Sequence, residues 1–380
     1  MQLVLSEDQE LLAKTAADFV KEHSPVARMR ALRDANDADG FSRSLWKQMA
    51  ELGWVGVPFP EELGGAEMGL AELAVVLEEL GRALAPEPFL STVLLGGQAV
   101  LLAGSDAQQK AWLEDVVNGE KFLALAQQER TSRFDLHRVA TKAEQDGDAY
   151  RLTGEKIAVL DGGVADAIVV VARTSGAEDD RDGITLFLVP ADAPGLRVER
   201  QSRVDSRGAA IVHLEGCQVG ADAVLGTVGE GLGVLEAVAD RATVALCAEM
   251  LGSMSEAFDR TVEYLKNRLQ FGVPIGSFQA LKHRAAECFI EIELCRSAVM
   301  AAARGVDEGS PDASKLVSLA KARCSDAGML VANEAVQMHG GVGMTDEYEI
   351  GFFLKRARAA ELTLGDASWH RARWAELSGY

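Results

Sequence analysis

The chain has 380 residues, of which 48% are hydrophobic and 25% charged, so it is long enough for two or three domains of a water-soluble type. Its formal net charge of -20 opposes binding to nucleic acid or to an anionic membrane, so neither is expected as a partner. The first residues lack the pattern of a signal peptide, and no apolar run reaches the roughly 18 residues of a membrane span. The histidines and cysteines show no metal-ligand or CxxC spacing, which predicts a cytoplasmic protein with reduced thiols and no metal site.

The first third of the chain is predicted to be helical. Ser6 starts the first helix as an N-cap, because Gln9 follows at the spacing of a capping box. Apolar residues then recur at helical spacing as far as His23. A loop rich in proline and glycine occupies residues 53–65. Further helical patterns cover residues 43–52, 69–83, 89–103 and 105–118.

From about residue 122 to residue 219 the period of the apolar residues changes to that of strands. Turn signals at residues 145–148 (QDGD) and 161–163 (DGG) separate some of the strand-like segments. Short strands at this spacing predict an antiparallel sandwich or barrel rather than a parallel sheet. The strand-like segments are residues 139–143, 149–152, 167–172, 184–189, 196–198 and 210–214.

The last part of the chain returns to helical spacing. Residues 229–233 (GEGLG) have the GxGxG pattern of some dinucleotide sites, but no strand–helix–strand unit surrounds them. We therefore interpret these glycines as a hinge into a long helix that ends near Asn267. Further helices are predicted over residues 277–304, 312–339 and 348–361.

Residues 268–279 (RLQFGVPIGSFQ) form a loop between two of these helices, with chemistry suited to a dinucleotide. Arg268 can make charge-assisted hydrogen bonds to a pyrophosphate. Gln270 offers an amide, and Phe271 offers an aromatic face for an adenine ring. The alternative is structural: Arg268 caps the end of a helix and Phe271 fills the core.

Residues 337–343 (QMHGGVG) form a second candidate segment. Gly340 and Gly341 lack Cβ atoms, so their backbone N–H groups can approach a phosphate closely. The same glycines also form a helix C-cap after His339. His339 itself is expected to support its neighbours rather than to act as a base.

In this order the two segments resemble the acyl-CoA dehydrogenase family, whose members bind FAD between subunits and remove a substrate α-proton with a glutamate. The resemblance covers about residues 3–377 and includes the loop at 53–65. It implies an α+β chain with the acyl-CoA dehydrogenase fold: an N-terminal α-helical domain (1–120), a middle β-barrel or sandwich domain (121–220) and a C-terminal four-helix bundle (221–380) that makes a homo- or hetero-oligomer. It further implies an acyl-CoA substrate and FAD as the cofactor. The residues that would reach the FAD of a neighbouring subunit are Arg268, Gln270, Phe271, Gln337, Gly340 and Gly341.

Two segments of the middle domain depart from the family. The family motif TEPxAGSD corresponds to residues 128–135 (QERTSRFD), in which only Glu129 and Asp135 are retained. The bulk of Arg133 and Phe134 is at odds with the usual approach of the flavin, although an arginine could pair with phosphate. The family segment Trp-Ile-Thr-Asn corresponds to residues 158–161 (AVLD), so the aromatic cover of the flavin ring and the hydroxyl group beside it are both missing.

The catalytic glutamate of the family is also missing. It usually stands in a Tyr-Glu-Gly triplet, which here reads Thr363-Leu364-Gly365. A minority of the family carries it on the long helix, at the position of Ala242. Neither leucine nor alanine can take a proton from carbon. Asp366 follows the triplet, and we expect it to cap the next helix.

This combination of kept cofactor contacts and lost catalytic groups resembles the small subunits of heteromeric acyl-CoA dehydrogenases, the pimeloyl-CoA dehydrogenase type among them. Three functions follow. The first is a subunit of an FAD-dependent acyl-CoA dehydrogenase whose partner chain supplies the base. The second is a flavin oxygenase or oxidase, whose chemistry needs no α-proton base. The third is a non-catalytic structural or acyl-CoA-binding subunit.

Overall fold

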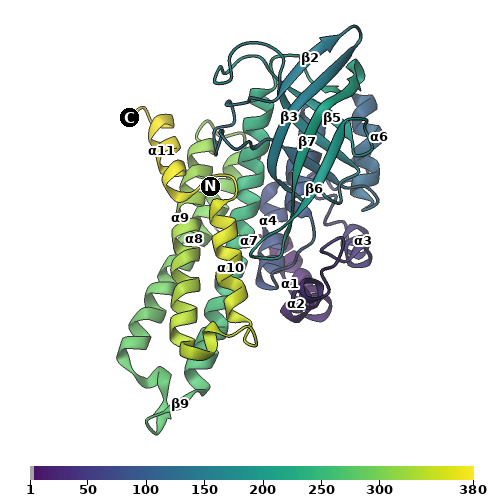
Figure 1. Cartoon of the computed structure of the whole chain (residues 1–380). Coiled ribbons are helices and arrows are strands. Elements are labelled where there is room, and N and C mark those ends of the chain that lie inside the picture. The colour runs from purple at the N-terminus through teal and green to yellow at the C-terminus, as the bar shows by residue number, and fades with distance from the viewer. Residues whose placement is uncertain (1–3) are drawn as a thin grey trace. The chain divides into compact units, whose positions relative to one another are not determined.

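The computed structural model describes residues 4–380, and they form two compact units. One unit comprises the described part of Met1–Ala35 together with Gly69–Ala85 and Thr243–Tyr380. The other comprises Asn36–Met68 and Pro86–Ala242. Helices therefore occur at both ends of the chain and a β-sheet in its middle, as the sequence predicts (Figure 1).

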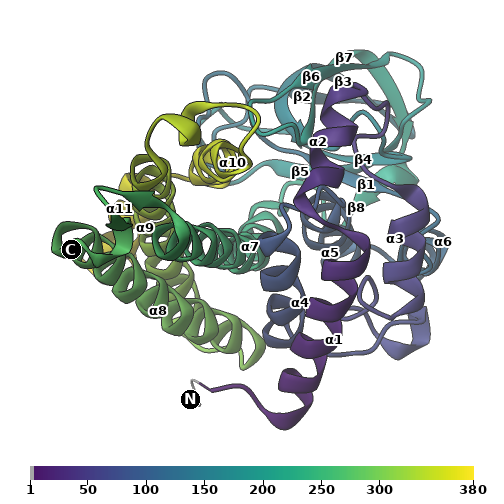
Figure 2. The same ribbon diagram turned by 90° about the horizontal axis from the view of Figure 1, so that it is seen from below.

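The first unit is almost entirely helical. In the C-terminal part, α8, α10 and α11 all pack against α9 (Figure 2). Its elements are α1 (Glu7–His23), α2 (Val26–Asp34), α4 (Leu70–Arg82), the part of α7 (Leu232–Asn267) from Thr243, β9 (Leu269–Gln270), β10 (Val273–Pro274), η4 (Ile275–Ser277), α8 (Gln279–Asp307), α9 (Ala313–His339), η5 (Gly340–Met344), α10 (Ile350–Leu362) and α11 (Ala367–Leu377).

Helix α4 joins the N-terminal helices to the C-terminal ones by close backbone contact. A Cβ atom on Gly252 of α7 would lie 1.7 Å from the carbonyl oxygen of Glu78, so only glycine permits this approach. The carboxylate of Asp307, at the end of α8, accepts hydrogen bonds from the backbone N–H groups of Leu70 and Ala71. These contacts cap α4 and fix it to α7 and α8.

The second unit holds the β-sheet and the remaining helices. The eight strands form one sheet in the order β6-β7-β3-β2-β4-β5-β8, with β1 paired to β4. The buried core lies mainly on strands β1, β3, β4, β5 and β7, and β2 contributes Ala143. The elements are α3 (Arg43–Glu51), η1 (Glu61–Leu63), η2 (Phe89–Gly97), α5 (Gln98–Ala103), α6 (Asp106–Val117), β1 (Leu123–Ala126), β2 (Lys142–Asp146), β3 (Ala149–Leu160), β4 (Ala167–Arg173), β5 (Ile184–Pro190), β6 (Leu196–Ser202), β7 (Gly208–Gly220), η3 (Ala221–Ala223) and β8 (Val224–Leu225).

Several details of the sheet differ from the prediction. The strand predicted at 139–143 begins only at Lys142, because the carboxylate of Glu129 accepts the N–H groups of Ala140 and Thr141. The sheet is mixed rather than purely antiparallel, since β1 and β2 both pair in parallel with β4. Strand β1 was not predicted because all four of its residues are buried and show no alternation.

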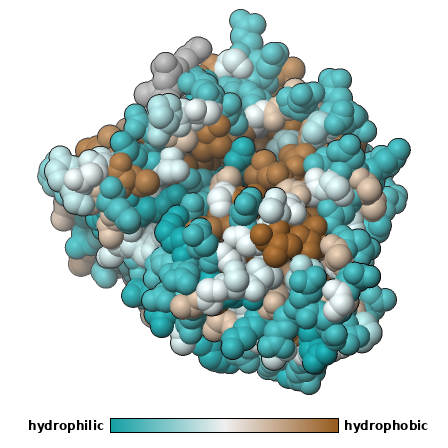
Figure 3. Space-filling view, turned by 90° about the horizontal axis from the view of Figure 1, so that it is seen from above, coloured by the Kyte–Doolittle hydropathy of each residue, from teal (hydrophilic) through white to brown (hydrophobic). Residues whose placement is uncertain are grey.

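Most helix boundaries agree with the prediction. Ser6 caps α1 through a complete capping box with Gln9. The helix predicted over residues 89–103 is in fact a π-helix, η2, followed by the short helix α5. Within residues 4–380 no helix combines the length and the apolar character that a membrane crossing requires. Figure 3 shows one face of the protein, on which hydrophilic residues predominate and hydrophobic residues gather in small patches.

Candidate functional site

The first dinucleotide segment forms a hairpin that projects from the ends of α7 and α8 (Figure 1). Strands β9 and β10 pair in antiparallel fashion around the two-residue turn Phe271-Gly272. Both turn residues have positive φ angles, 54° and 79°, as the tightest hairpin turns require. A left-handed conformation costs a phenylalanine about 1 kcal/mol, and here it holds a ring that is 90% exposed. The structural alternative, in which Phe271 fills the core, is therefore wrong.

Arg268 follows α7 directly and is exposed. Its side chain makes no ion pair or hydrogen bond with any other residue in 4–380. By contrast, Arg284 nearby is held by both carboxylate oxygens of Glu334. The guanidinium of Arg268 is thus available to an anion that the chain itself does not supply.

The second segment ends α9 in a glycine-rich turn. Gly340 forms the C-cap of α9 with φ 65°, as the sequence predicts. Gly341 has no positive φ angle, and a Cβ atom built on it would meet no atom within 4 Å. Nothing within the chain therefore requires glycine at this position. The open space above its backbone fits the close approach of a ligand phosphate.

The two segments are brought together by the last turns of α7. Tyr264 stacks on His339 with ring centroids 4.3 Å apart, and its hydroxyl donates to the His339 carbonyl oxygen at 3.3 Å. One turn earlier, Arg260 bonds to Glu349 at 2.6 Å. Arg260 and Tyr264 are four residues apart and share one face of α7, and Tyr264 on that face contacts the second segment.

A groove of about 540 Å³ lies at the second segment. It receives Gln337, Gly340 and Gly341, but not Arg268, Gln270 or Phe271, which stand on the hairpin. The structure thus places three of the six predicted cofactor residues in one groove and leaves the other three exposed on the hairpin. The groove is lined by Arg284, Asn333, Glu334, Val336, Gln337, Gly340, Gly341, Met344 and Leu354.

His339 is buried and does not line this groove. Its Nδ1 lies 2.7 Å from the Ala335 carbonyl oxygen, which assigns the proton to Nδ1. Burial lowers the pKa of this histidine, so it is neutral at pH 7. Its role is to stack on Tyr264, as expected for a residue that supports the turn rather than acting as a base.

The turn that would carry the catalytic glutamate is well formed but has no acidic group. Leu364 occupies it with φ 58°, and Asp366 beyond it caps α11 by accepting from the Trp369 N–H, as predicted. Buried Lys321 donates to the carbonyl oxygens of Gly365 at 2.7 Å and Glu361 at 2.9 Å. The remaining position considered from the sequence, Ala242, is fully buried in α7.

His370 also holds this turn. Its Nε2 lies 2.9 Å from the Leu364 carbonyl oxygen, and burial lowers the pKa of the imidazole to about 3. Burial likewise lowers the pKa of Lys321 to about 8. Lys321 and His370 were not recognised from the sequence, and a polar residue at a core position of an apolar helix face is the signal that could have identified them.

In the second unit, residues 128–135 are organised around a buried ion pair. The Nζ atom of Lys156 lies 2.6 Å from Glu129. Although burial opposes ionisation, the charge and hydrogen bond of Lys156 hold the pKa of Glu129 below its ordinary value. Arg133 has a left-handed backbone, and its guanidinium lies over the ring of Phe134 at 5.1 Å.

Residues 158–161, the counterpart of the family's ring-covering segment, do not fit a flavin ring. Leu160 is buried and brings no hydroxyl group, and Ala158 brings no aromatic ring. The Asp161 carboxylate accepts a hydrogen bond from the Ser91 hydroxyl at 2.6 Å, and burial raises the pKa of Asp161. Ser91 was missed because it lies in the apolar run of η2. The residues present therefore suit the dinucleotide half of FAD better than its ring.

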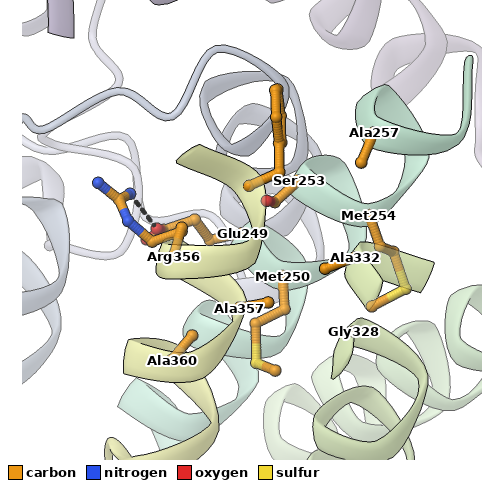
Figure 4. A pocket seen from close by; sticks show the side chains of 11 residues that line it. Glu249, Met250, Ser253, Met254, Ala257, Gly328, Ala332, Arg356, Ala357 and Ala360 are labelled. Atoms are coloured by element: carbon orange, nitrogen blue, oxygen red, sulfur yellow. Dashed lines mark hydrogen bonds and ion pairs between the residues drawn. The ribbon is translucent and has the colours of Figure 1, made fainter. Parts of the chain in front are cut away.

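A small enclosed cavity lies between α7, α9 and α10 and is no alternative site (Figure 4). Its volume of about 10 Å³ admits at most one water molecule. Glu249 and Arg356 beside it are bonded to each other at 2.9 Å. No group of three or more His, Cys, Asp or Glu side chains among residues 4–380 could hold a metal ion.

Comparisons with known proteins agree with this architecture. The models of the N-terminal, middle and C-terminal domains of acyl-CoA dehydrogenases match residues 6–120, 124–217 and 229–377. The chain is 30% identical to the probable acyl-CoA dehydrogenase YngJ of Bacillus subtilis over 98% of both chains. It superimposes on a chain of the ChsE4–ChsE5 complex from Mycobacterium tuberculosis with a TM-score of 0.90 and 30% identity over 100% of both chains. It superimposes on butyryl-CoA dehydrogenase from Megasphaera elsdenii with a TM-score of 0.91 and 26% identity over 99% of both chains.

Proposed function

Because the chain belongs to the acyl-CoA dehydrogenase family, we propose that it is the subunit of a heteromeric acyl-CoA dehydrogenase that lacks the catalytic base. The family consists of FAD-dependent oxidoreductases that act on CH–CH bonds, and FAD is the cofactor. The observation that carries the proposal is the contrast between Arg268, which is exposed and has no partner among residues 4–380, and Leu364, which stands where the resemblance places the base.

In this proposal the chain contributes its dinucleotide contacts to the FAD of a partner chain with the same fold. Arg268 pairs with the pyrophosphate, and Phe271 covers the adenine. Gln270 and Gln337 donate amide hydrogen bonds, and the backbone at Gly340 and Gly341 approaches the phosphates. These roles are supported by the open hairpin and by the groove at the end of α9.

The substrate is an acyl-CoA thioester. When bound, FAD would supply the acceptor for the β-hydride of the acyl group, and in this proposal a carboxylate of the partner chain would serve as the base for the α-proton. This chain's residues bind and orient the cofactor, and its net charge of -20 makes the local cations important for holding phosphate. We also propose cytoplasmic location and the domain bounds 1–120, 121–220 and 221–380.

The test is FAD retention in the assembly that forms around the affinity-tagged chain in its own cells. We expect Arg268→Ala to lower the amount of FAD per assembly after gel filtration, because a charge-assisted contact to the pyrophosphate is lost. Arg151→Ala, which removes a surface arginine paired with Asp146 in the other unit, is the matched control. Equal retention in the two variants would refute the assigned role of Arg268.

The absence of a base at Leu364 and Ala242 favours one alternative, a flavin oxygenase or oxidase on the same fold. Oxygen consumption by the assembly with an acyl-CoA and no other electron acceptor would support it. A third possibility is a non-catalytic structural or acyl-CoA-binding subunit. The segments 128–135 and 158–161, which depart from the family pattern, favour this possibility. To test for a dehydrogenase, an acyl-CoA and an electron-accepting dye are added to the assembly. Reduction of the dye that is lost when the partner chain is removed would support a dehydrogenase.

A further inference from the structure

Helix α2 is a short helix that is held in place largely by charged side chains. It buries only Val26 and Met29, so the apolar surface that anchors it is small. Arg30 and Arg33 are three residues apart and therefore project from one face of α2. Both side chains bond to the segment between η5 and α10, which follows more than three hundred residues later in the chain. We call Arg30 and Arg33 the α2 arginines.

The α2 arginines meet at the carboxylate of Asp346. Arg33 donates to both carboxylate oxygens, from Nη1 to Oδ1 at 2.7 Å and from Nη2 to Oδ2 at 2.8 Å, which is bidentate geometry. Arg30 donates to Oδ2 at 3.0 Å and to the Glu347 carbonyl oxygen at 3.3 Å. The hydrogen bonds from Arg33 lower the pKa of Asp346 to about 2, so this carboxylate is ionised at neutral pH.

The same two arginines also contact α10. The ring of Phe352 is buried, and the guanidinium carbons of Arg30 and Arg33 lie 4.5 Å and 5.0 Å from its centroid. A cation at this distance from an aromatic ring is attracted to it. The α2 arginines therefore hold two stretches of chain at once, the segment after η5 and the first turn of α10.

We propose that the α2 arginines are positioning residues for the cofactor, an inference that rests on the proposed function. Met344 lies two residues before Asp346, and Leu354 lies two residues after Phe352. Both Met344 and Leu354 line the groove at the second segment. By holding Asp346 and Phe352, the α2 arginines fix the part of the groove wall that Met344 and Leu354 form, although they do not line the groove themselves.

The contact with α2 is local, and the fold around it has other supports. The segment 345–349 is also held at the last turns of α7, where Arg260 bonds to Glu349 at 2.6 Å. The side chain of Asp346 is 55% exposed, and ion pairs at exposed positions add little to global stability. Loss of the α2 contact should therefore loosen the groove wall without unfolding the chain.

The first measurement is hydrogen–deuterium exchange on the full chain purified alone. Arg33→Ala should speed backbone exchange in residues 340–349 at least threefold, because the bidentate contact is lost. Arg43→Ala in the other unit is the matched control and should leave this exchange unchanged. Arg43 also donates twice to one aspartate, Asp39, and also lies over a phenylalanine ring, at 4.8 Å from Phe122. Thermal melting confirms that each variant is folded.

The second measurement is the rate of FAD release from the assembly that forms around the tagged chain in its own cells, followed by flavin fluorescence. Arg33→Ala and Asp346→Ala should each release FAD at least threefold faster than the wild type. The double variant should release FAD no faster than the faster single variant, because both changes remove the same contact. Arg33→Lys keeps the charge but not the bidentate geometry and should give an intermediate rate.

Each outcome decides one step. Unchanged exchange in Arg33→Ala would show that α2 does not hold the segment after η5. Faster exchange with an unchanged rate of FAD release would overturn the positioning role, and so would additive effects of Arg33→Ala and Asp346→Ala. A wild-type assembly without FAD would refute the proposed function itself, and the exchange measurement, which needs no FAD, distinguishes that result from a failure of the α2 contact.

Discussion

The end of α9 and the turn before α11 differ in their side chains: the first has residues predicted for cofactor binding, and the second has no acidic residue at the position predicted for a base. At the end of α9, the groove is lined by Gln337, Gly340 and Gly341, which are residues predicted to contact a dinucleotide, and the hairpin holds Phe271 exposed. At Thr363–Gly365 the backbone turn is retained and firmly bonded, but the side chain within it is that of Leu364. The comparison teaches that a well-bonded backbone turn can be present without an acidic side chain in it.

The energetics of the turn support this interpretation. A left-handed backbone costs leucine about 1 kcal/mol, so a leucine alone would not select this conformation. Lys321 and His370 impose it through hydrogen bonds to the carbonyl oxygens on either side of the side chain. The turn is therefore determined by its supports and not by the residue that it displays.

The largest expected effect tests those supports. Lys321→Met leaves the buried carbonyl oxygens of Glu361 and Gly365 without a donor, which should lower the free energy of unfolding by about 3 kcal/mol. Urea denaturation measures this loss. Lys315→Met on the same helix removes a partly exposed lysine and should change the free energy of unfolding by less than about 0.5 kcal/mol. Equal stability of the two variants would show that Lys321 does not hold the turn.

The pH dependence of stability probes the second support. The pKa of folded His370 is about 3, below the ordinary 6.5, so between these values the unfolded chain binds a proton that the folded chain does not. This contribution therefore makes stability fall as pH drops from 6.5 towards 3, by up to about 1.4 kcal/mol per pH unit. The free energies of unfolding of the wild type and of His370→Gln, measured at pH 7 and at pH 5, isolate the contribution of His370. Between pH 7 and pH 5 the wild type should lose more free energy of unfolding than His370→Gln. Equal losses in the two proteins would contradict the low pKa of His370. His23→Gln on α1 is the control and should behave like the wild type.

Gly341 and Gly343, two glycines in the turn after α9, allow a test of whether this turn serves the fold or a ligand. A Cβ atom on Gly343 would lie 2.8 Å from the Val336 carbonyl oxygen, so Gly343→Ala should cost about 2 kcal/mol of stability. A Cβ atom on Gly341 meets nothing, so Gly341→Ala should change stability by less than about 0.5 kcal/mol while weakening FAD retention in the assembly. Thermal melting and FAD content measure the two effects. A large loss of stability in Gly341→Ala would mean that this glycine serves the fold and not a ligand.

The sequence was sufficient for most of the helices, though not for α2 (Val26–Asp34), and for the order of helical and β regions. Ser6 with Gln9, and Asp366, are local signals, because a helix cap depends on residues within one turn. The start of β2 was predicted wrongly, because it depends on the Glu129 carboxylate, eleven residues before Ala140 in the chain. The π-helix η2 and the parallel pairing of β1 were missed for the same reason: both depend on packing between segments and not on local pattern.

For the candidate site, the sequence suggested which residues could contact a cofactor but did not show how they are held. The exposure of Phe271 could not be predicted, because an aromatic residue beside a glycine occurs in cores and in turns alike. The stacking of Tyr264 on His339 joins segments 75 residues apart in the chain, which no periodicity reveals. The roles of Arg268, Gln270, Phe271, Gln337, Gly340 and Gly341 in cofactor binding stay predictions.

The central claim is that this chain contributes dinucleotide contacts to a partner's FAD without building a complete flavin site of its own. The most direct measurement is the visible absorption spectrum of the chain expressed and purified alone, compared with that of its native assembly. We predict a colourless chain and a yellow assembly. A full flavin band from the chain alone would contradict the account, because Leu160 and Asp161 would then be part of a working ring site.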